Sequence, residues 1–384
     1  MQAIENGLAR VRAVLERRRP SYPVYAPNYW QWLAHQRNHG RLPPELAGRR
    51  SQLEMIRHLG LDVFSRNLYC DQKRRWFGGL ADEVFDGVEC RVEETIEGAD
   101  LVRVITYATR RGALTERLRY VFAESTLVQE KFLLDDPDRQ LDAFEEWVRA
   151  RRWQFFPERY RQVQDDVGTD GLVVAGELFS PLKLLHLAAG AVNTTFLLQD
   201  HGKRLRGIMA EHEQAMLGLT AQIVGAGVPV LMAMDNLDTA FHPPRYVENY
   251  SARFYEQASR ICHEHGALFF IHACGQQRGN LRLMDSLGVD GLEGVAFPPL
   301  GDVELAEAFR MTSDRFLITG GISAMETRDL TSRAEVFGYV HRLLDTLQPY
   351  HHRFILSASC NTATDAPWET LVHFRDAWRE WGDG

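Results

Sequence analysis

The sequence predicts an α/β fold of the (β/α)8 type, a TIM barrel. The chain has 384 residues, which suits one elaborated barrel domain. Eight short apolar or β-branched segments recur along it, and stretches with helical periodicity separate most of them. These predicted strands are residues 22–26, 61–65, 172–176, 230–234, 268–273, 291–296, 316–319 and 354–358. Residues 1–384 are therefore expected to form a single barrel domain.

The first 20 residues precede the first predicted strand. Arginines alternate there with apolar residues such as Leu8, Val11 and Val14, a pattern typical of an amphipathic helix. We expect an N-terminal helix that closes one end of the fold. A patch that binds phosphate or a membrane surface is the alternative.

Helical periodicity is clearest in two segments. In residues 203–225 and 246–265, apolar side chains recur every three or four positions. Gly227 and Gly266 follow these segments, and glycine commonly ends a helix. The last helix is expected to begin near Asp365 and Pro367, a capping residue followed by a first-turn proline.

Residues 88–135 interrupt the strand–helix alternation. Residues 88–92, 101–107 and 126–132 have strand patterns, and Arg111-Gly112 marks a possible turn. We interpret this stretch as a β-hairpin insertion after strand two, beside the mouth of the barrel.

Composition excludes several classes of function. The net charge of −8 argues against a nucleic-acid partner. No apolar stretch approaches the roughly 20 residues that span a bilayer, and Glu5 and Glu16 interrupt any secretory signal. The five cysteines are odd in number and scattered, which suits a reducing compartment. We expect a cytoplasmic protein that does not enter membranes.

A metal site is predicted where two strands end. His272 and Cys274 are two residues apart at the end of the fifth strand, so they point to the same side. Cys360 ends the eighth strand. One imidazole and two thiolates are a natural Zn²⁺ set, and three protein ligands leave an open catalytic position. The alternative is an interior histidine and two buried thiols.

Other polar and aromatic residues also follow predicted strands. Glu177 and Asp235 are the candidate catalytic acids, because an unpaired carboxylate among apolar residues is costly. Structural carboxylates, and aromatics that only pack a loop, are the alternatives. The candidate substrate-binding residues are Asn236, Asp238, Glu293, Tyr29 and Trp30.

Several motifs resemble the uroporphyrinogen decarboxylase superfamily. They are residues 270–275 (FIHACG), 265–266 (HG), 287–291 (LGVDG), 112–114 (GAL) and 366–369 (APWE). True decarboxylases of this superfamily carry an Arg-rich motif near the N-terminus, and residues 25–30 lack it. In the zinc-dependent branch, which works with corrinoid proteins, His-x-Cys is followed much later by Cys. His272, Cys274 and Cys360 match that signature.

The resemblance implies a zinc-dependent methyltransferase. It would move a methyl group between a small thiol or methyl ether and a corrinoid (cobalamin) carried by a partner protein. Asp235 or Glu177 would orient the substrate or relay a proton. One alternative is a metal-free decarboxylase in which Asp235 stabilises a protonated ring intermediate. The other is a barrel that binds a ligand or partner without catalysis.

Overall fold

Six parallel strands form the main sheet of the computed structural model, which describes residues 5–49, 51–69 and 79–383. Their order follows the sequence: β9 (Ala175–Leu178), β10 (Val230–Leu237), β11 (Leu268–Ala273), β12 (Gly291–Val295), β13 (Leu317–Ile322) and β14 (Phe354–Ala358). The predicted strands from residue 230 onward match β10–β14 to within three residues at each end. The α/β fold is thus confirmed.

The parallel strands outside this sheet are less regular. β1 (Val63–Ser65) pairs in parallel with β8 (Gly171–Val173), and β8 continues into β9 through Val174. The predicted first strand, residues 22–26, forms only one bridge, between Tyr25 and Leu356. Two backbone hydrogen bonds join this segment to Leu356 of β14: Ala26 N–H to Leu356 O at 2.9 Å and Leu356 N–H to Val24 O at 3.0 Å. On the other side, Asp62 N–H donates to Tyr25 O at 3.0 Å.

The prediction of a regular strand at residues 22–26 was wrong. Pro23 and Pro27 flank the paired residues, and proline has no N–H to donate to a strand ladder. The segment still lies between β14 and β1, because its few bonds reach both sides.

Helices follow most strands. Before β1 come α2 (Trp30–Asn38), η1 (Pro44–Leu46) and α3 (Gln52–Leu59). Helices α6 (Pro181–Ala189) and α7 (Ala191–Gly225) follow β9, and α8 (Pro244–Tyr250) and α9 (Ala252–Glu264) follow β10. Helix α10 (Leu281–Ser286) follows β11, and α11 (Leu305–Met311) follows β12. After β13 come α12 (Ala324–Asp329), α13 (Arg333–Leu347) and η3 (Gln348–Arg353), and after β14 comes α14 (Trp368–Asp383). No helix of the described residues is long and apolar enough to cross a membrane.

Side chains alternate across the strands and so make two apolar layers. Met232 and Met234 of β10 and Phe270 of β11 belong to an inner cluster, together with Val11 and Val14 of α1 (Gly7–Leu15). Residues between these positions pack outward against the helices. Helix α1 therefore covers one end of the inner layer.

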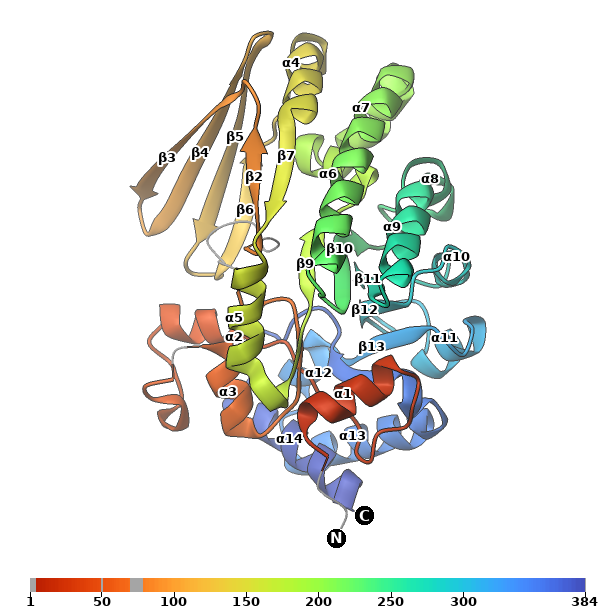
Figure 1. Ribbon diagram of the computed structural model, residues 1–384. Helices are drawn as coiled ribbons and strands as arrows, with labels where there is room; N and C mark the ends of the chain where they lie inside the picture. Colours follow the sequence, from red (N-terminus) through yellow and green to blue (C-terminus); the bar gives the residue numbers. More distant parts are fainter. Residues whose placement is uncertain (1–4, 50, 70–78, 384) are drawn as a thin grey trace.

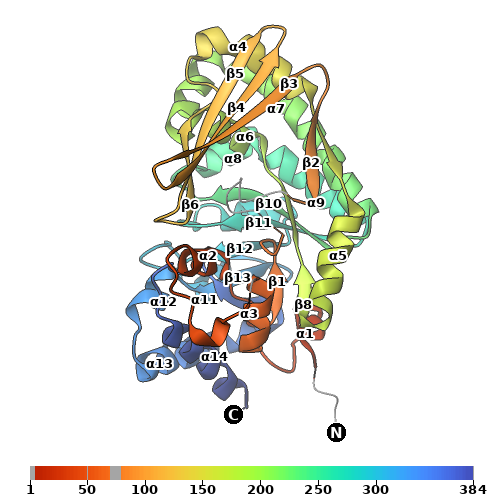
Figure 2. The ribbon, with the colours of Figure 1, turned by 90° about the vertical axis from the view of Figure 1, so that its left-hand side faces the viewer.

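The inserted segment forms a larger structure than the predicted hairpin. Four antiparallel strands pair in sequence order: β3 (Glu89–Glu97), β4 (Asp100–Thr109), β5 (Gly112–Val121) and β6 (Thr126–Lys131). β2 (Ala81–Phe85) and β7 (Arg151–Phe155) form a separate antiparallel pair. In the sequence, α4 (Pro137–Ala150) comes between β6 and β7. Helices α5 (Pro157–Val167) and η2 (Gly168–Asp170) then connect β7 to β8. This inserted sheet lies at the end of the molecule opposite both termini (Figures 1 and 2).

Candidate metal centre

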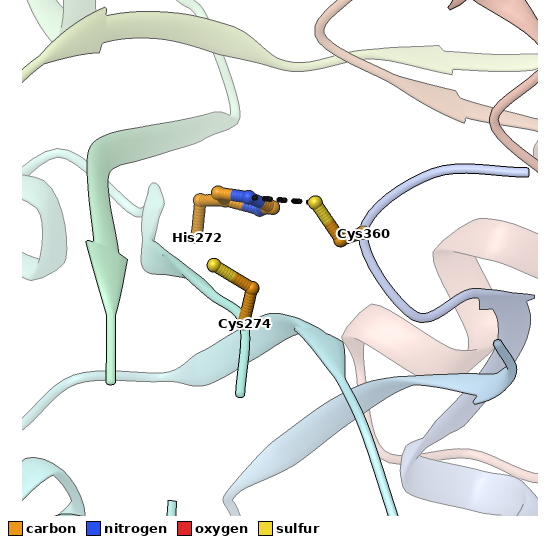
Figure 3. Close-up of side chains that lie close together, drawn as sticks. All are labelled: His272, Cys274 and Cys360. Atoms are coloured by element: carbon orange, nitrogen blue, oxygen red, sulfur yellow. Dashed lines mark hydrogen bonds between the residues drawn. The ribbon is translucent and has the colours of Figure 1, made fainter. Parts of the chain in front are cut away.

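The structure brings the three predicted metal ligands together. His272 is on β11, Cys274 directly follows that strand, and Cys360 follows β14. Their ligand atoms all lie within 4.8 Å of one another, and His272 Nε2 is 3.7 Å from Cys360 Sγ (Figure 3). Tetrahedral Zn²⁺ with ordinary bond lengths separates such atoms by about 3.5–3.8 Å. The geometry therefore fits a zinc ion.

Strand alternation explains why His272 faces inward. Phe270, two residues earlier on β11, belongs to the inner apolar cluster, so His272 points to the same side. Gly294 on β12 allows the close approach of the ligands. A Cβ there would lie 2.7 Å from Ala273 O and 3.2 Å from His272 Cε1, and its φ of +88° favours glycine.

Cys360 itself has a φ of +84°, a conformation that is costly for a residue other than glycine and that clusters at functional sites. Asn28 holds this loop in place, because its Nδ2 donates to Cys360 O and to Asn361 Oδ1, each at 2.9 Å.

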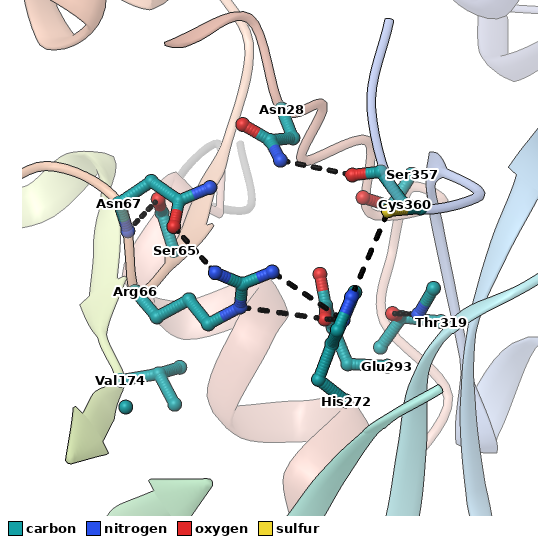
Figure 4. A network of polar contacts seen from close by, with 12 residues as sticks. Asn28, Ser65, Arg66, Asn67, Val174, His272, Glu293, Thr319, Ser357 and Cys360 are labelled. Carbon is teal, nitrogen blue, oxygen red and sulfur yellow. Dashed lines mark hydrogen bonds and ion pairs between the residues drawn. The ribbon is translucent and has the colours of Figure 1, made fainter. Parts of the chain in front are cut away.

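A buried carboxylate orients the histidine. Glu293 Oε2 bonds to His272 Nδ1, which leaves Nε2 facing the two thiols (Figure 4). The Arg66 Nε lies 3.6 Å from the same carboxylate oxygen. Burial opposes ionisation, but the charges of His272 and Arg66 outweigh it and lower the pKa of Glu293 to about 2. A carboxylate behind a metal-binding histidine fixes its tautomer and orientation.

The two thiols differ in acidity. The hydrogen bond from Cys360 and the nearby His272 ring lower the pKa of Cys274 to about 4, although burial opposes this. The neighbouring Cys274 and burial raise the pKa of Cys360 far above its usual value. Two thiolates this close repel each other unless a cation lies between them. The donor set is therefore suited to a divalent soft metal such as Zn²⁺.

A pocket of about 170 Å³ adjoins the metal ligands. The inserted sheet contributes Ser125, Thr126 and Leu127 to its wall, where β6 begins. The other lining residues are Trp30, Gln31, Arg66, Asn236, His272, Cys360 and Asn361. Two of the predicted substrate-binding residues, Trp30 and Asn236, thus lie beside His272 and Cys360.

Other predicted residues lie away from this pocket. Tyr29 is 1% exposed within the outer apolar layer, so it does not cover a ligand at the mouth. Asp238 accepts a hydrogen bond from Ala240 N–H at 2.8 Å, and burial raises its pKa. Glu293 lies behind His272 and is not among the lining residues.

The two predicted catalytic acids also point elsewhere. Asp235 follows inward-facing Met234, so its carboxylate faces outward, where it accepts hydrogen bonds from Tyr255 Oη and from Ser180 N–H at 2.8 Å. Burial raises its pKa. Glu177 accepts the Leu80 N–H at 3.0 Å and lines a different cavity, of about 780 Å³, under the inserted sheet.

Sequence reasoning missed Arg66 and Asn361, both of which line the pocket. Arg66 directly follows β1, and the rule that placed Cys360 at a strand end could have found it. The remaining cysteines do not join the centre: Cys90 is on β3 and Cys262 is buried in α9, while Cys70 lies outside the described residues.

Comparisons with known proteins place this chain in a family. No curated protein matches the chain. Among solved structures, it is similar to a methyltransferase from Methanosarcina mazei, with a TM-score of 0.56 and 13% identity over 98% of this chain and 99% of that chain. It is also similar to a B12-independent methionine synthase from Shewanella sp. W3-18-1, with a TM-score of 0.45 and 10% identity over 94% and 96% of the two chains.

At 13% identity, the similarity to the Methanosarcina mazei structure shows a shared fold alone. The sequence itself carries the stronger relation, because a family model described as uroporphyrinogen decarboxylase (URO-D) matches residues 134–381. That range is more than half of the chain and includes the histidine and both cysteines of the centre. The chain therefore belongs to the uroporphyrinogen decarboxylase (URO-D) family.

Proposed function

We propose that this protein is a zinc-dependent methyltransferase, built on a closed (β/α)8 barrel, that moves a methyl group between a small thiol or methyl ether and a corrinoid protein. The observation that carries the proposal is the convergence of His272, Cys274 and Cys360 beside a pocket. Three protein ligands leave one tetrahedral position for a substrate sulfur or oxygen.

Zn²⁺ held by these residues would lower the pKa of a bound thiol, or act as a Lewis acid on an ether oxygen. Glu293 would keep the His272 ring in position, and Arg66 would balance the Glu293 charge. Asn28 would hold the loop that carries Cys360. A contact in the structure supports each of these proposed roles.

Catalytic roles for Asp235 and Glu177 have weaker support than the proposed metal ligands. The contacts of Asp235 with Tyr255 and Ser180 favour a structural role. Glu177 would have to act from the neighbouring cavity. A decarboxylase in which Asp235 stabilises a ring intermediate needs this carboxylate at the mouth, and its outward orientation does not favour that alternative.

The corrinoid would be carried by a separate protein that approaches the mouth of the barrel. We propose that the reaction takes place in the cytoplasm, because free thiols of a metal site persist best under reducing conditions. The methyl ether and the thiol remain alternative small-molecule substrates within this proposal.

Metal analysis tests the proposal most directly. We expect one Zn²⁺ per chain in the purified protein and its loss in Cys360→Ser, because two ligands hold zinc far more weakly than three. Cys90→Ser is the matched control, since Cys90 lies on β3 away from the centre, and should keep its zinc.

Methyl transfer is then measured from methylcobalamin to a thiol, by the change in corrinoid absorbance. We expect transfer in the wild type and in Cys90→Ser, and its loss in Cys360→Ser. Full activity in a metal-free preparation would contradict the proposal.

A further inference from the structure

The end of β10 is distorted next to the metal centre. The pairing register between β10 and β11 shifts between Ala233 and Leu237, and Asn236 within this bulge has a φ of +51°. A bulge re-aims a side chain, and such bulges are frequent beside active sites. Asparagine tolerates the left-handed conformation better than most residues.

The bulge is fixed to the segment that carries the metal ligands. Leu237 O accepts the Cys274 N–H at 3.1 Å and also a hydrogen bond from Gln277 Nε2. The position of Asn236 is thus tied to that of Cys274. A distortion held this firmly is suited to placing one side chain accurately.

The side chain of Asn236 presents an unused acceptor. Its Oδ1 is buried and has no hydrogen-bond partner among the residues that the structure describes. Asn236 lines the same pocket as His272 and Cys360. Because a buried acceptor without a donor costs free energy, a bound molecule that supplies the donor gains affinity.

The pocket limits the size and charge of that molecule. Its volume is about 170 Å³, and a cavity of about 150 Å³ holds one benzene molecule. Its described lining contains no Asp or Glu that could pair with an ammonium group, and its one guanidinium, Arg66, already faces Glu293. A small neutral molecule therefore fits best.

We infer that the substrate is a small neutral molecule with a hydroxyl or amide N–H group a few bonds from the sulfur or oxygen atom that the metal would hold, and that Asn236 Oδ1 accepts a hydrogen bond from that group. The inference rests on the proposed function, because the metal is what would hold that sulfur or oxygen. Asn236 then selects the substrate, since a site built for a hydrogen bond rejects an analogue that lacks the donor.

Two thiols of equal size test this selection on the zinc-loaded protein. The probes are 2-mercaptoethanol and 1-propanethiol, which differ by a hydroxyl in place of a methyl group, and the measurement is their dissociation constants by calorimetry. We expect 2-mercaptoethanol to bind at least about tenfold more tightly. Equal binding of the two thiols would overturn the inference while leaving the proposed function intact.

Two variants test whether Asn236 causes the preference for 2-mercaptoethanol over 1-propanethiol. Asn236→Gly removes the acceptor and accepts the positive φ without strain, so we expect the preference to disappear. Asn236→Asp keeps an acceptor of the same size and adds a charge, so the preference should remain and 2-aminoethanethiol should bind more tightly than to the wild type. Discrimination that survives in Asn236→Gly would exclude Asn236 as its cause.

Zinc content and thermal midpoint are measured for each variant, so that a folding defect is recognised. If Asn236→Gly does not fold, two measurements still test the inference. They are the affinities of the wild type for the two thiols, and the affinity of Asn236→Asp for 2-aminoethanethiol. A wild-type protein that binds no zinc, or binds neither thiol when zinc-loaded, overturns the proposed function and this inference with it.

Discussion

The hydrogen bond between Glu293 and His272 decides which ring nitrogen faces the two thiols. Glu293→Gln removes the charge of the acceptor and leaves Arg66 without its carboxylate partner. We expect the affinity for Zn²⁺ to fall by about 10–100-fold, the usual effect of losing such an orienting partner. Competition with a coloured chelator measures the affinity.

Glu307→Gln is the matched control for this change. Glu307 is a glutamate that pairs with Arg278 on the surface, so the same substitution there should leave zinc affinity unchanged. Equal affinities of Glu293→Gln and the wild type would show that His272 keeps its orientation without Glu293.

The convergence of the three candidate ligands could be predicted because each obeys a local rule. His272 and Cys274 share a side of one strand, and Cys360 lies where another strand ends. Arg66 and Glu293 could not be assigned their contact in this way, because it joins two strands more than 200 residues apart. The contact of Asp235 with Tyr255 of α9 likewise joins two separate elements, and the alternation of Asp235 with inward-facing Met234 agrees with it.

One buried hydrogen-bonded pair links strand β10 to helix α9. Tyr255 Oη donates to Asp235, whose other oxygen accepts the Ser180 N–H. In Tyr255→Phe the carboxylate loses a donor while it stays buried, so we expect the free energy of unfolding to fall by about 1–3 kcal/mol. Urea denaturation followed by tryptophan fluorescence measures it.

Zinc affinity should stay unchanged in Tyr255→Phe, because this pair faces away from the pocket. Tyr250→Phe, on α8, removes a hydroxyl outside the pair and is expected to change stability less. If Tyr255→Phe lowered zinc affinity as much as stability, Asp235 would be part of the metal centre after all.

Elements with strong periodicity were predictable, and their interruptions were not. Residues 203–225 form the second part of α7, which starts at Ala191 and bends where His201 has a φ of −122°. Residues 246–265 divide at Ser251 into α8 and α9. Strand β5 was overlooked because its polar positions carry long charged side chains, although buried Leu114, Leu118 and Tyr120 alternate with them.

At the scale of the whole molecule, the inserted sheet and the parallel main sheet meet around buried Glu177. The cavity beside it is also lined by Arg103 of β4 and Trp153 of β7. Burial raises the pKa of Glu177 from 4.5 to about 7, although the N–H groups of Leu80 and Ala81 favour its ionised form. The junction between the two parts of the molecule therefore contains a carboxyl group that titrates near neutral pH.

This raised pKa makes the stability of the whole fold depend on pH. Below pH 4.5 Glu177 is neutral in both the folded and the unfolded chain. As the pH rises to 7, the unfolded chain releases this proton while the folded chain keeps it, so stability is lost, on the order of 3 kcal/mol in total.

A Glu177→Gln variant tests this pH dependence, because glutamine cannot ionise. Between pH 5 and pH 8, the free energy of unfolding of the variant should rise relative to that of the wild type by on the order of 3 kcal/mol. Urea denaturation at each pH measures the difference, with Glu256→Gln on the surface of α9 as control. A difference between Glu177→Gln and the wild type that stays constant with pH would mean that Glu177 ionises at its ordinary value, and that water reaches the junction.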